Sequence, residues 1–181
     1  TKELPMNILI TGAKGFVGRN LTETLKTIRD GKNRTRNLTI GEIFEYDLDT
    51  DPALLKAYCE KADFVFNLAG VNRPQNQAEF MQGNFGFAST LLDTLKACGN
   101  TCPVMLSSSI QATLIGRYDS EYGRSKKAGE ELFFSYGEET GAKVLVYRFS
   151  NLFGKWCRHN YNSAVATFCH SIAHDLPITV S

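Results

Sequence analysis

Two side chains with complementary chemistry lie four residues apart in the segment SEYGRSKKAGEELFF, residues 120–134. Tyr122 carries a phenol and Lys126 an ammonium group, and this spacing places both on one face of a helix. A free phenol has a pKa of about 10, and a neighbouring ammonium group favours the phenolate. The pair therefore predicts a phenol that exchanges a proton with a carbonyl substrate. A surface helix is the alternative, because the spacing is common by chance.

A hydroxyl group for the same substrate oxygen is available shortly before this pair. The segment PVMLSSSIQA places three serines, Ser107, Ser108 and Ser109, at the end of a predicted strand, and one of these hydroxyls could hold the oxygen. Serines in such a place also serve simply to cap a strand end. The hydroxyl, the phenol and the ammonium group together predict a catalytic set of one of these serines with Tyr122 and Lys126.

A glycine-rich turn near the start of the chain predicts a dinucleotide site. In MNILITGAKGFVGRNL, three glycines follow the pattern G-x-x-G-x-x-G directly after an apolar segment. Such a turn lets a pyrophosphate approach the amide groups at the positive end of a helix. Glycines that serve only a turn are the alternative. The predicted cofactor-binding residues of this turn are Gly12, Lys14, Gly15, Phe16, Val17 and Gly18.

The choice between NAD and NADP stays open at this level. Asp47, which follows the second apolar segment, lies 29 residues after Gly18, whereas about 20 is usual. The basic loop at residues 30–37 accounts for the excess. At the adenosine ribose, Asp47 would favour NAD, whereas Lys14 or the basic loop would favour the phosphate of NADP. Asp47 and Leu48 are alternatively a pair that contacts the adenine.

Short apolar segments alternate with helical patterns and predict an α/β fold, a Rossmann-type doubly wound parallel sheet. The third segment ends in Leu68, Ala69 and Gly70, whose small size leaves room for a cofactor. Asp51 before Pro52 predicts a helix start, and Gly141 a helix end. The strands are predicted at Met6–Thr11, Ile43–Tyr46, Phe64–Leu68, Val104–Leu106 and Val144–Phe149, all buried on both faces. The helices are predicted at residues 15–28, 53–62, 87–98 and 125–141.

Composition excludes several classes of protein. The 20 Lys and Arg against 19 Asp and Glu leave a net charge of +1, which predicts no nucleic-acid partner. No apolar run is long enough to span a membrane, so no membrane partner is predicted. The five cysteines are irregularly spaced and predict free thiols in the cytoplasm. His170 and His174 lack the glutamate of the zinc-protease pattern, so no metal is predicted.

The motifs TGAKGFVG, NLAG, SSS and YGRSK, in this order, resemble the extended short-chain dehydrogenase/reductase family, also called the NAD-dependent epimerase/dehydratase family. This resemblance implies Ser109, Tyr122 and Lys126 as the catalytic trio, with the adjacent Ser108 as the alternative serine. It places Tyr122 and Lys126 also at the cofactor. It implies that Asn84 supports the active site beside the substrate. It also implies a possible homodimer formed through helix pairs.

LAGVNRP, SSSIQAT and NLFGKWCRHNYNSAVATF are similar, more closely, to the CapF-type reductases of capsular polysaccharide synthesis. That resemblance implies reduction of the 4-keto group of a UDP-linked deoxysugar with NADPH. An epimerase without net cofactor consumption and a non-catalytic dinucleotide-binding protein are the alternatives. Gln111 stands where dehydratases and epimerase-reductases of the wider family carry other residues, which favours simple reduction. The implied substrate contacts are Arg73, Asn84, Gln111, Asn151, Asn160, Asn162 and Phe168.

The expected domain organisation follows from the same resemblance. Residues 1–181 form an NAD(P)-binding domain whose last part, from about residue 151, begins the sugar-nucleotide-binding lobe. The rest of the lobe and any cupin domain are expected to be absent from this chain.

Overall fold

The computed structural model describes residues 4–71 and 78–178. They fall into two compact units, residues 1–148 and 149–181. The first unit holds the sheet and its helices. The elements are β1 (Met6–Thr11), α1 (Phe16–Arg29), β2 (Ile40–Tyr46), α2 (Leu54–Lys61), β3 (Phe64–Asn67), α3 (Ala78–Met81), η1 (Gln82–Gly86), α4 (Phe87–Ala97), β4 (Val104–Ser109), η2 (Ile110–Thr113), η3 (Gly116–Tyr118), α5 (Glu121–Thr140), β5 (Val144–Phe149) and α6 (Ala164–Ala173).

Within the described residues, five strands form one sheet in the order β2-β1-β3-β4-β5. The pairs β1/β2, β1/β3 and β3/β4 are parallel. Thr11 lies opposite Asn67, and Asn67 lies opposite Leu106, so the carboxyl ends of these strands meet at one edge. The predicted Rossmann-type sheet is therefore confirmed, and its carboxyl edge is where such folds bind ligands.

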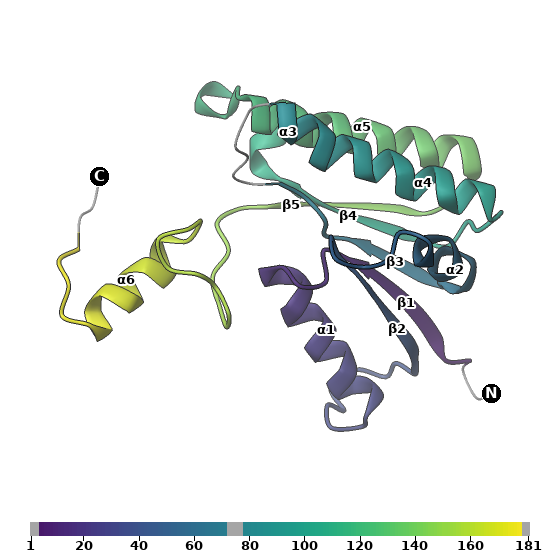
Figure 1. The fold of residues 1–181 in the computed structure, drawn as a ribbon, viewed down its shortest axis with the longest axis horizontal. Coiled ribbons are helices and arrows are strands. Elements are labelled where there is room, and N and C mark those ends of the chain that lie inside the picture. Colours follow the sequence, from purple (N-terminus) through teal and green to yellow (C-terminus); the bar gives the residue numbers. More distant parts are fainter. Residues whose placement is uncertain (1–3, 72–77, 179–181) are drawn as a thin grey trace. The chain divides into compact units, whose positions relative to one another are not determined.

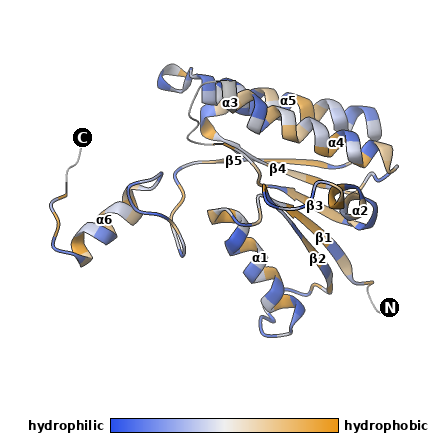
Figure 2. Cartoon of the chain, viewed as in Figure 1, coloured by the Kyte–Doolittle hydropathy of each residue, from blue (hydrophilic) through white to orange (hydrophobic). Residues whose placement is uncertain are grey.

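Helices cover both faces of the sheet, as Figure 1 shows. Ile8 and Ile10 of β1 pack with Leu25 and Ile28 of α1 on one face. Leu9, which points the opposite way, belongs to the larger core under α2, α4 and α5. The alternation along β1 thus feeds two cores, and the strands form the apolar layer between them in Figure 2.

Three predicted element details differ in the structure. Helix α2 begins at Leu54, one residue later than predicted. The Asp51 carboxylate accepts the amide proton of Ala53, and the Asp51 carbonyl accepts that of Leu54, so a separate turn precedes the helix. Strand β4 continues through the serines to Ser109. Strand β5 is half-buried to exposed along its length, whereas burial on both faces was expected.

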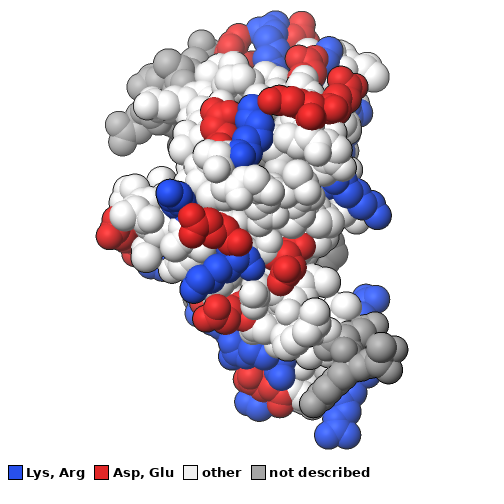
Figure 3. All heavy atoms as spheres, turned by 90° about the vertical axis from the view of Figure 1, so that its right-hand side faces the viewer, with Lys and Arg blue, Asp and Glu red and all other residues white. Residues whose placement is uncertain are grey.

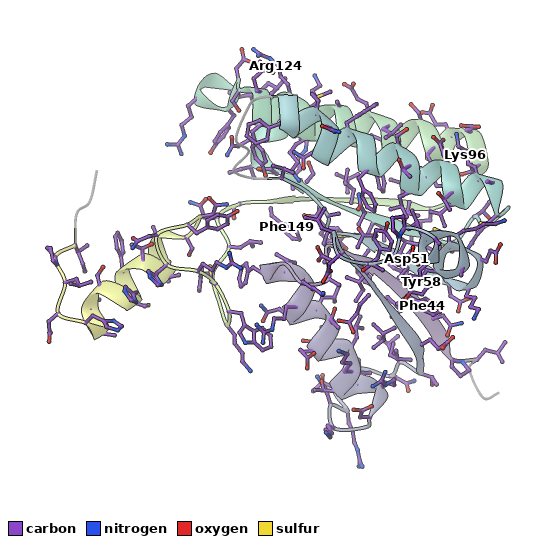
Figure 4. All side chains as sticks on the ribbon, in the orientation of Figure 1. Phe44, Asp51, Tyr58, Lys96, Arg124 and Phe149 are labelled. Atoms are coloured by element: carbon purple, nitrogen blue, oxygen red, sulfur yellow. The ribbon has the colours of Figure 1, made fainter. Side chains whose placement is uncertain are left out.

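Aromatic stacking and helix caps hold several of these elements in place. The Phe44 ring of β2 and the Tyr58 ring of α2 stack with their centroids 4.8 Å apart, and both are labelled in Figure 4. Helix α5 begins where Ser120 accepts a hydrogen bond from the amide of Gly123 and ends at Gly141, whose φ is 76°. The predicted glycine C-cap is therefore confirmed.

Three general properties of the described residues are the distribution of charge on the surface, the state of the cysteines and the apolarity of the helices. On the face drawn in Figure 3, basic and acidic side chains are interspersed. All five cysteines are free thiols. Among the described residues, no helix is long and apolar enough to cross a membrane. In the second unit, α6 begins where the Ser163 hydroxyl caps the amide of Ala166.

Candidate active site

The glycine-rich turn between β1 and α1 forms a backbone cradle. Gly12 has a φ of 67°, and a Cβ there would lie 2.7 Å from the backbone nitrogen of Ala69. A Cβ on Gly18 would lie 2.1 Å from the carbonyl oxygen of Gly12, so side chains are excluded where α1 packs on the turn. The first turn of α1 holds no acidic residue, and Gly15 provides no side-chain cap for its amides. These amides suit an anion, so the turn fits a dinucleotide pyrophosphate.

A buried hydrogen bond joins the turn to the end of β3. The Thr11 hydroxyl donates to the Asn67 side-chain oxygen over 2.6 Å and accepts a long bond from the amide of Ala69. Both polar side chains are almost fully buried. Sequence reasoning did not assign them a role, although two polar residues ending apolar strands are a usable signal.

The end of β2 approaches the same turn. One Asp47 oxygen accepts the amide proton of Lys14 over 2.8 Å, and the other accepts the amide proton of Leu48 over 2.8 Å. The Lys14 ammonium group is paired with Asp49. The Leu48 side chain is fully exposed. Asp47 is thus positioned beside the cradle, as expected of a residue that meets the adenosine ribose.

The basic loop lies at the other end of α1 from the glycine turn. It follows Arg29, and an α-helix of 14 residues is about 21 Å long. The suggestion that this loop supplies a partner for a cofactor phosphate is therefore wrong. The loop does account for the long spacing between Gly18 and Asp47, because it connects α1 to β2.

Tyr122, Lys126 and Ser109 come together at the carboxyl edge of the sheet. The Lys126 ammonium nitrogen lies 5.7 Å from the centroid of the Tyr122 ring and donates to the carbonyl oxygen of Ser107 over 3.3 Å. The Ser109 hydroxyl interacts with the Tyr122 phenol. A Cβ on Gly70 would lie 3.1 Å from the Lys126 nitrogen. The segment after β3, residues 68–70, therefore lies between the glycine cradle and Lys126.

The neighbouring serine serves a different purpose. The Ser108 hydroxyl donates to Glu130, which lies one helical turn beyond Lys126 on α5. Arg148 of β5 donates to both oxygens of Glu130, over 2.9 and 2.6 Å. Burial raises the pKa of Glu130, but the hydrogen bonds from Arg148 and Ser108 outweigh it and the pKa is lowered. Ser108 is thus occupied by the buried Glu130 carboxylate, which pairs with the half-exposed Arg148, and Ser109 is the serine beside the phenol.

The pKa shifts of Tyr122 and Lys126 differ from those expected from the sequence. Burial raises the pKa of Tyr122, and the interaction with Ser109 lowers it only in part. Burial lowers the pKa of Lys126 to about 8. The expectation that Lys126 lowers the phenol pKa is wrong for this structure, because the ammonium group is itself desolvated and directed to a carbonyl. The phenol therefore stays protonated at neutral pH.

Asn84 organises the site from within the π-helix η1. Its side-chain oxygen accepts the amide proton of Val71 over 2.9 Å, and its nitrogen donates to Val71 and to the Ser125 hydroxyl. The Ser125 hydroxyl donates in turn to the carbonyl of Tyr122. Asn84 thus connects the segment after β3 to the first turn of α5. Ser125 was not predicted, although it directly precedes Lys126.

The remaining predicted substrate contacts are spread over the chain. Arg73 lies outside the described residues. Gln111 is half-buried, and its backbone amide donates to the Ser109 hydroxyl over 3.2 Å. Phe168 is half-buried within the second unit. Asn151, Asn160 and Asn162 are exposed in that unit.

The described histidines cluster in the second unit without forming a metal site. The His159 and His170 rings stack with centroids 3.6 Å apart, and His174 follows on the same helix side. Among the described residues, no group of three His, Cys, Asp or Glu side chains could hold a metal ion.

Comparison with known proteins gives a consistent family. The model of the NAD dependent epimerase/dehydratase family matches residues 8–181. The chain is 43% identical over 179 residues to UDP-2-acetamido-2,6-beta-L-arabino-hexul-4-ose reductase of Pseudomonas aeruginosa, covering 97% of this chain and 44% of the relative. It is 27% identical over 210 residues to UDP-glucuronate 4-epimerase 1 of Arabidopsis thaliana, covering 97% of this chain and 48% of the relative.

A solved structure agrees with the sequence relatives. The capsular polysaccharide assembling protein CapF from Staphylococcus aureus is 46% identical and superposes with a TM-score of 0.78. That match covers 97% of this chain and 44% of CapF. The chain therefore spans about half the length of the relatives it matches.

Proposed function

Because the chain belongs to the NAD dependent epimerase/dehydratase family, we propose that it is the dinucleotide-binding part of a sugar-nucleotide reductase. Its reaction is the NAD(P)H-dependent reduction of the 4-keto group of a UDP-linked deoxysugar, in the synthesis of a capsular or surface polysaccharide precursor. The relative from Pseudomonas aeruginosa, by its name a hexul-4-ose reductase, supports this reaction. The similarity to CapF supports the polysaccharide context.

One observation carries the proposal. The Tyr122 phenol, the Ser109 hydroxyl and the Lys126 ammonium group lie together, and Gly70 connects them to the glycine cradle. A proton donor, an orienting hydroxyl and a dinucleotide cradle are the parts that carbonyl reduction needs.

The cofactor would be held by the residues around the cradle. Its pyrophosphate would lie against the amides of Gly15, Phe16 and Val17, and its adenosine ribose beside Asp47. Leu68, Ala69 and Gly70 would line the space between the ribose units, and Lys126 would meet the nicotinamide ribose. When bound, the nicotinamide supplies the hydride.

The protein residues handle the proton. Ser109 would orient the keto oxygen by a hydrogen bond, and Tyr122 would donate its proton to the oxygen as negative charge develops. The raised pKa of Tyr122 suits a donor, because the phenol carries its proton at neutral pH. Lys126, with a pKa of about 8, can then return a proton to the phenolate.

The sugar nucleotide would approach from the same edge. Gln111 lies next to Ser109 and is the proposed contact within the first unit. Arg73, Asn151, Asn162 and Phe168 remain predicted contacts. Asn84 would act by positioning, since its amide bonds Val71 and Ser125. A homodimer and a cytoplasmic location also remain predictions.

An epimerase is the second candidate, supported by the similarity to a UDP-glucuronate 4-epimerase. An epimerase first takes a hydride from the sugar and later returns it, so no cofactor is consumed. The same phenol would accept a proton in the oxidative step and donate it in the reductive step, so net cofactor consumption separates the two candidates. A protein that only binds the dinucleotide would need no proton donor at all.

The test is net oxidation of NADH or NADPH with a UDP-4-keto-deoxysugar, carried out on the protein that contains this chain. We expect stoichiometric loss of nicotinamide absorbance, and a fall in turnover of about 10²- to 10⁴-fold in Tyr122→Phe. Tyr118→Phe, a tyrosine on η3, is the matched control and should stay active. Turnover of the sugar without net oxidation would favour the epimerase. Full activity of Tyr122→Phe would refute the proposed proton donor.

A further inference from the structure

The helical segment that precedes α4 contacts the first turn of α5 at two points. Phe80 of α3 and Asn84 of η1 lie four residues apart, so they share one side of this segment. The centroids of the Phe80 and Tyr122 rings lie 5.5 Å apart, with the ring planes tilted by 59°. The Asn84 amide donates to the Ser125 hydroxyl over 3.1 Å. One segment thus places an apolar ring and an amide against the helix that carries the proposed proton donor.

The backbone around Tyr122 is fixed by other contacts. The Ser125 hydroxyl donates to the carbonyl oxygen of Tyr122 over 2.8 Å. A Cβ on Gly123 would lie 2.6 Å from the carbonyl oxygen of Gln111, so the start of α5 packs directly against η2. These contacts set where the Tyr122 side chain begins, but rotation about its side-chain bonds is decided by the groups that touch the ring.

The side chains at the half-buried Tyr122 ring make different kinds of contact. Among the described residues, Lys126 is the charged group that faces the ring, with its nitrogen 5.7 Å from the ring centroid. Ser109 interacts with the phenol hydroxyl. Phe80 brings neither a charge nor a hydrogen bond, so its contribution is apolar contact and the exclusion of water. Its distance from the Tyr122 ring lies within the range of favourable aromatic pairs.

Exclusion of water matters for a proton donor. Burial is the largest cause of the raised pKa of Tyr122, and the interaction with Ser109 opposes it. A phenyl ring covers the phenol without offering a donor that would stabilise the phenolate. Loss of the Phe80 ring would admit water and lower the pKa of Tyr122 toward its ordinary value of 10.0.

We propose that Phe80 is a positioning residue of the proposed reaction, whose ring holds the Tyr122 phenol in the orientation that reaches Ser109 and shields it from water. The consequence for turnover rests on the proposed function, whereas the contact itself can be measured without a substrate. Phe80 acts through Tyr122, since its ring has no group that exchanges a proton.

Titration of the Tyr122 phenol tests the contact directly. The phenolate is followed by its near-ultraviolet absorbance in the protein that contains this chain, over the pH range in which circular dichroism shows an intact fold. Because this chain has seven tyrosines, the Tyr122 signal is obtained by subtracting the titration of the matching variant that also carries Tyr122→Phe. We expect the phenol of Phe80→Ala to ionise at a lower pH than that of wild type. Phe80→Tyr, which keeps the ring, should restore the wild-type titration.

Turnover of a UDP-4-keto-deoxysugar with NADH or NADPH tests the consequence. Phe80→Ala should lower kcat by up to about 10²-fold, because a misplaced proton donor has a cost of this order, and should change KM far less. Phe80→Tyr should restore kcat. Phe64→Ala is the matched control, because it removes a half-buried ring from another tilted pair, with Phe66, at the amino end of β3. This control should leave both the phenol titration and kcat unchanged.

The two measurements separate the inference from the proposed function. An unchanged phenol titration in Phe80→Ala would overturn the inference, as would an equal shift in Phe64→Ala. A shifted titration with unchanged kcat, in an enzyme that Tyr122→Phe inactivates, would also overturn it, because the contact would then not position the donor. Full activity of Tyr122→Phe is the separate result that refutes the proposed proton donor, and the catalytic role of Phe80 would be refuted with it.

Discussion

At the scale of single residues, the groups with proposed chemical roles lie on successive turns of α5, which packs against the end of β4. Tyr122, Lys126 and Glu130 are spaced by four residues along α5 and face the serines that end β4. The buried Glu130 pairs with the half-exposed Arg148, Lys126 is desolvated, and Tyr122 keeps its proton. Over two turns, the same helix face thus carries a structural residue, Glu130, and the two residues with proposed chemical roles, Lys126 and Tyr122.

The desolvation of Lys126 gives a stability prediction with a defined pH window. Its pKa is about 8 in the fold against an ordinary value of 10.5, so the unfolded chain binds more protons between these values. The Lys126 contribution to stability therefore rises with pH across this window. Lys126→Met should stabilise the fold at pH 7 by at most about 3 kcal/mol, and the gain should shrink toward pH 10.

Urea unfolding at both pH values measures this effect, with the neighbouring exposed Lys127→Met as the control. A Lys126→Met variant that is less stable than wild type at pH 7 would mean that the bond to the Ser107 carbonyl outweighs the desolvation of the ammonium group.

At the scale of elements, the turn between β1 and α1 packs its own backbone directly against the backbone of the segment after β3, where a side chain would not fit. Gly12 and Gly31 both have positive φ, 67° and 70°, but only Gly12 has other atoms within reach of a Cβ. The same substitution at the two sites separates backbone strain from a steric clash with the end of β3.

Gly12→Ala should lower the free energy of unfolding by more than Gly31→Ala and should weaken dinucleotide binding, because Ala69 must shift. The strain of positive φ alone costs about 1–2 kcal/mol, and it is shared by both variants. Thermal unfolding and titration with NADH measure the two effects. Equal behaviour of the two variants would show that the contact between the turn and β3 contributes nothing.

The π-helix η1 is an element with a specific purpose. A π-turn places Asn84 where its amide reaches both Val71 and Ser125, so the segment after β3 and the start of α5 are held by one side chain. Single π-turns within helices are frequent at functional sites. The sequence QGNFG does not reveal this turn, because its residues are compatible with an ordinary helix.

At the scale of the whole molecule, the proposed dinucleotide cradle and the proposed proton donor belong to the first unit, residues 1–148. The predicted sugar contacts Asn151, Asn162 and Phe168 belong to the second. The proposed reaction thus divides between a unit that holds the cofactor and a segment that contributes to the sugar site.

NADH should therefore slow amide hydrogen exchange in the first unit without changing α6. Protection is expected at the glycine turn, residues 12–18, and at the end of β3, because these amides line the proposed cofactor site. Exchange followed by mass spectrometry checks this, with Gly12→Ala as the variant in which the protection should be reduced. Protection confined to α6 would contradict the assignment of the cradle.

The sequence alone determined the features that depend on short-range periodicity. Apolar segments alternating with helical stripes specified the Rossmann-type sheet, and glycines at fixed spacing specified the turn between β1 and α1. The spacing of Tyr122 and Lys126 put both on one helix face. Each of these follows from geometry within a few residues, where backbone conformation decides which side chains share a face.

Only the tertiary structure decided which groups from distant segments meet. In the structure Ser108 bonds to Glu130, and Ser109 interacts with Tyr122. Lys14 pairs with Asp49, and the basic loop lies at the other end of α1 from the glycine turn. The pKa of the Tyr122 phenol is raised in the structure and not lowered as expected, because burial depends on all the elements that pack around the side chain. Strand register and the direction of each connection set these contacts, and neither is encoded in the spacing of one segment.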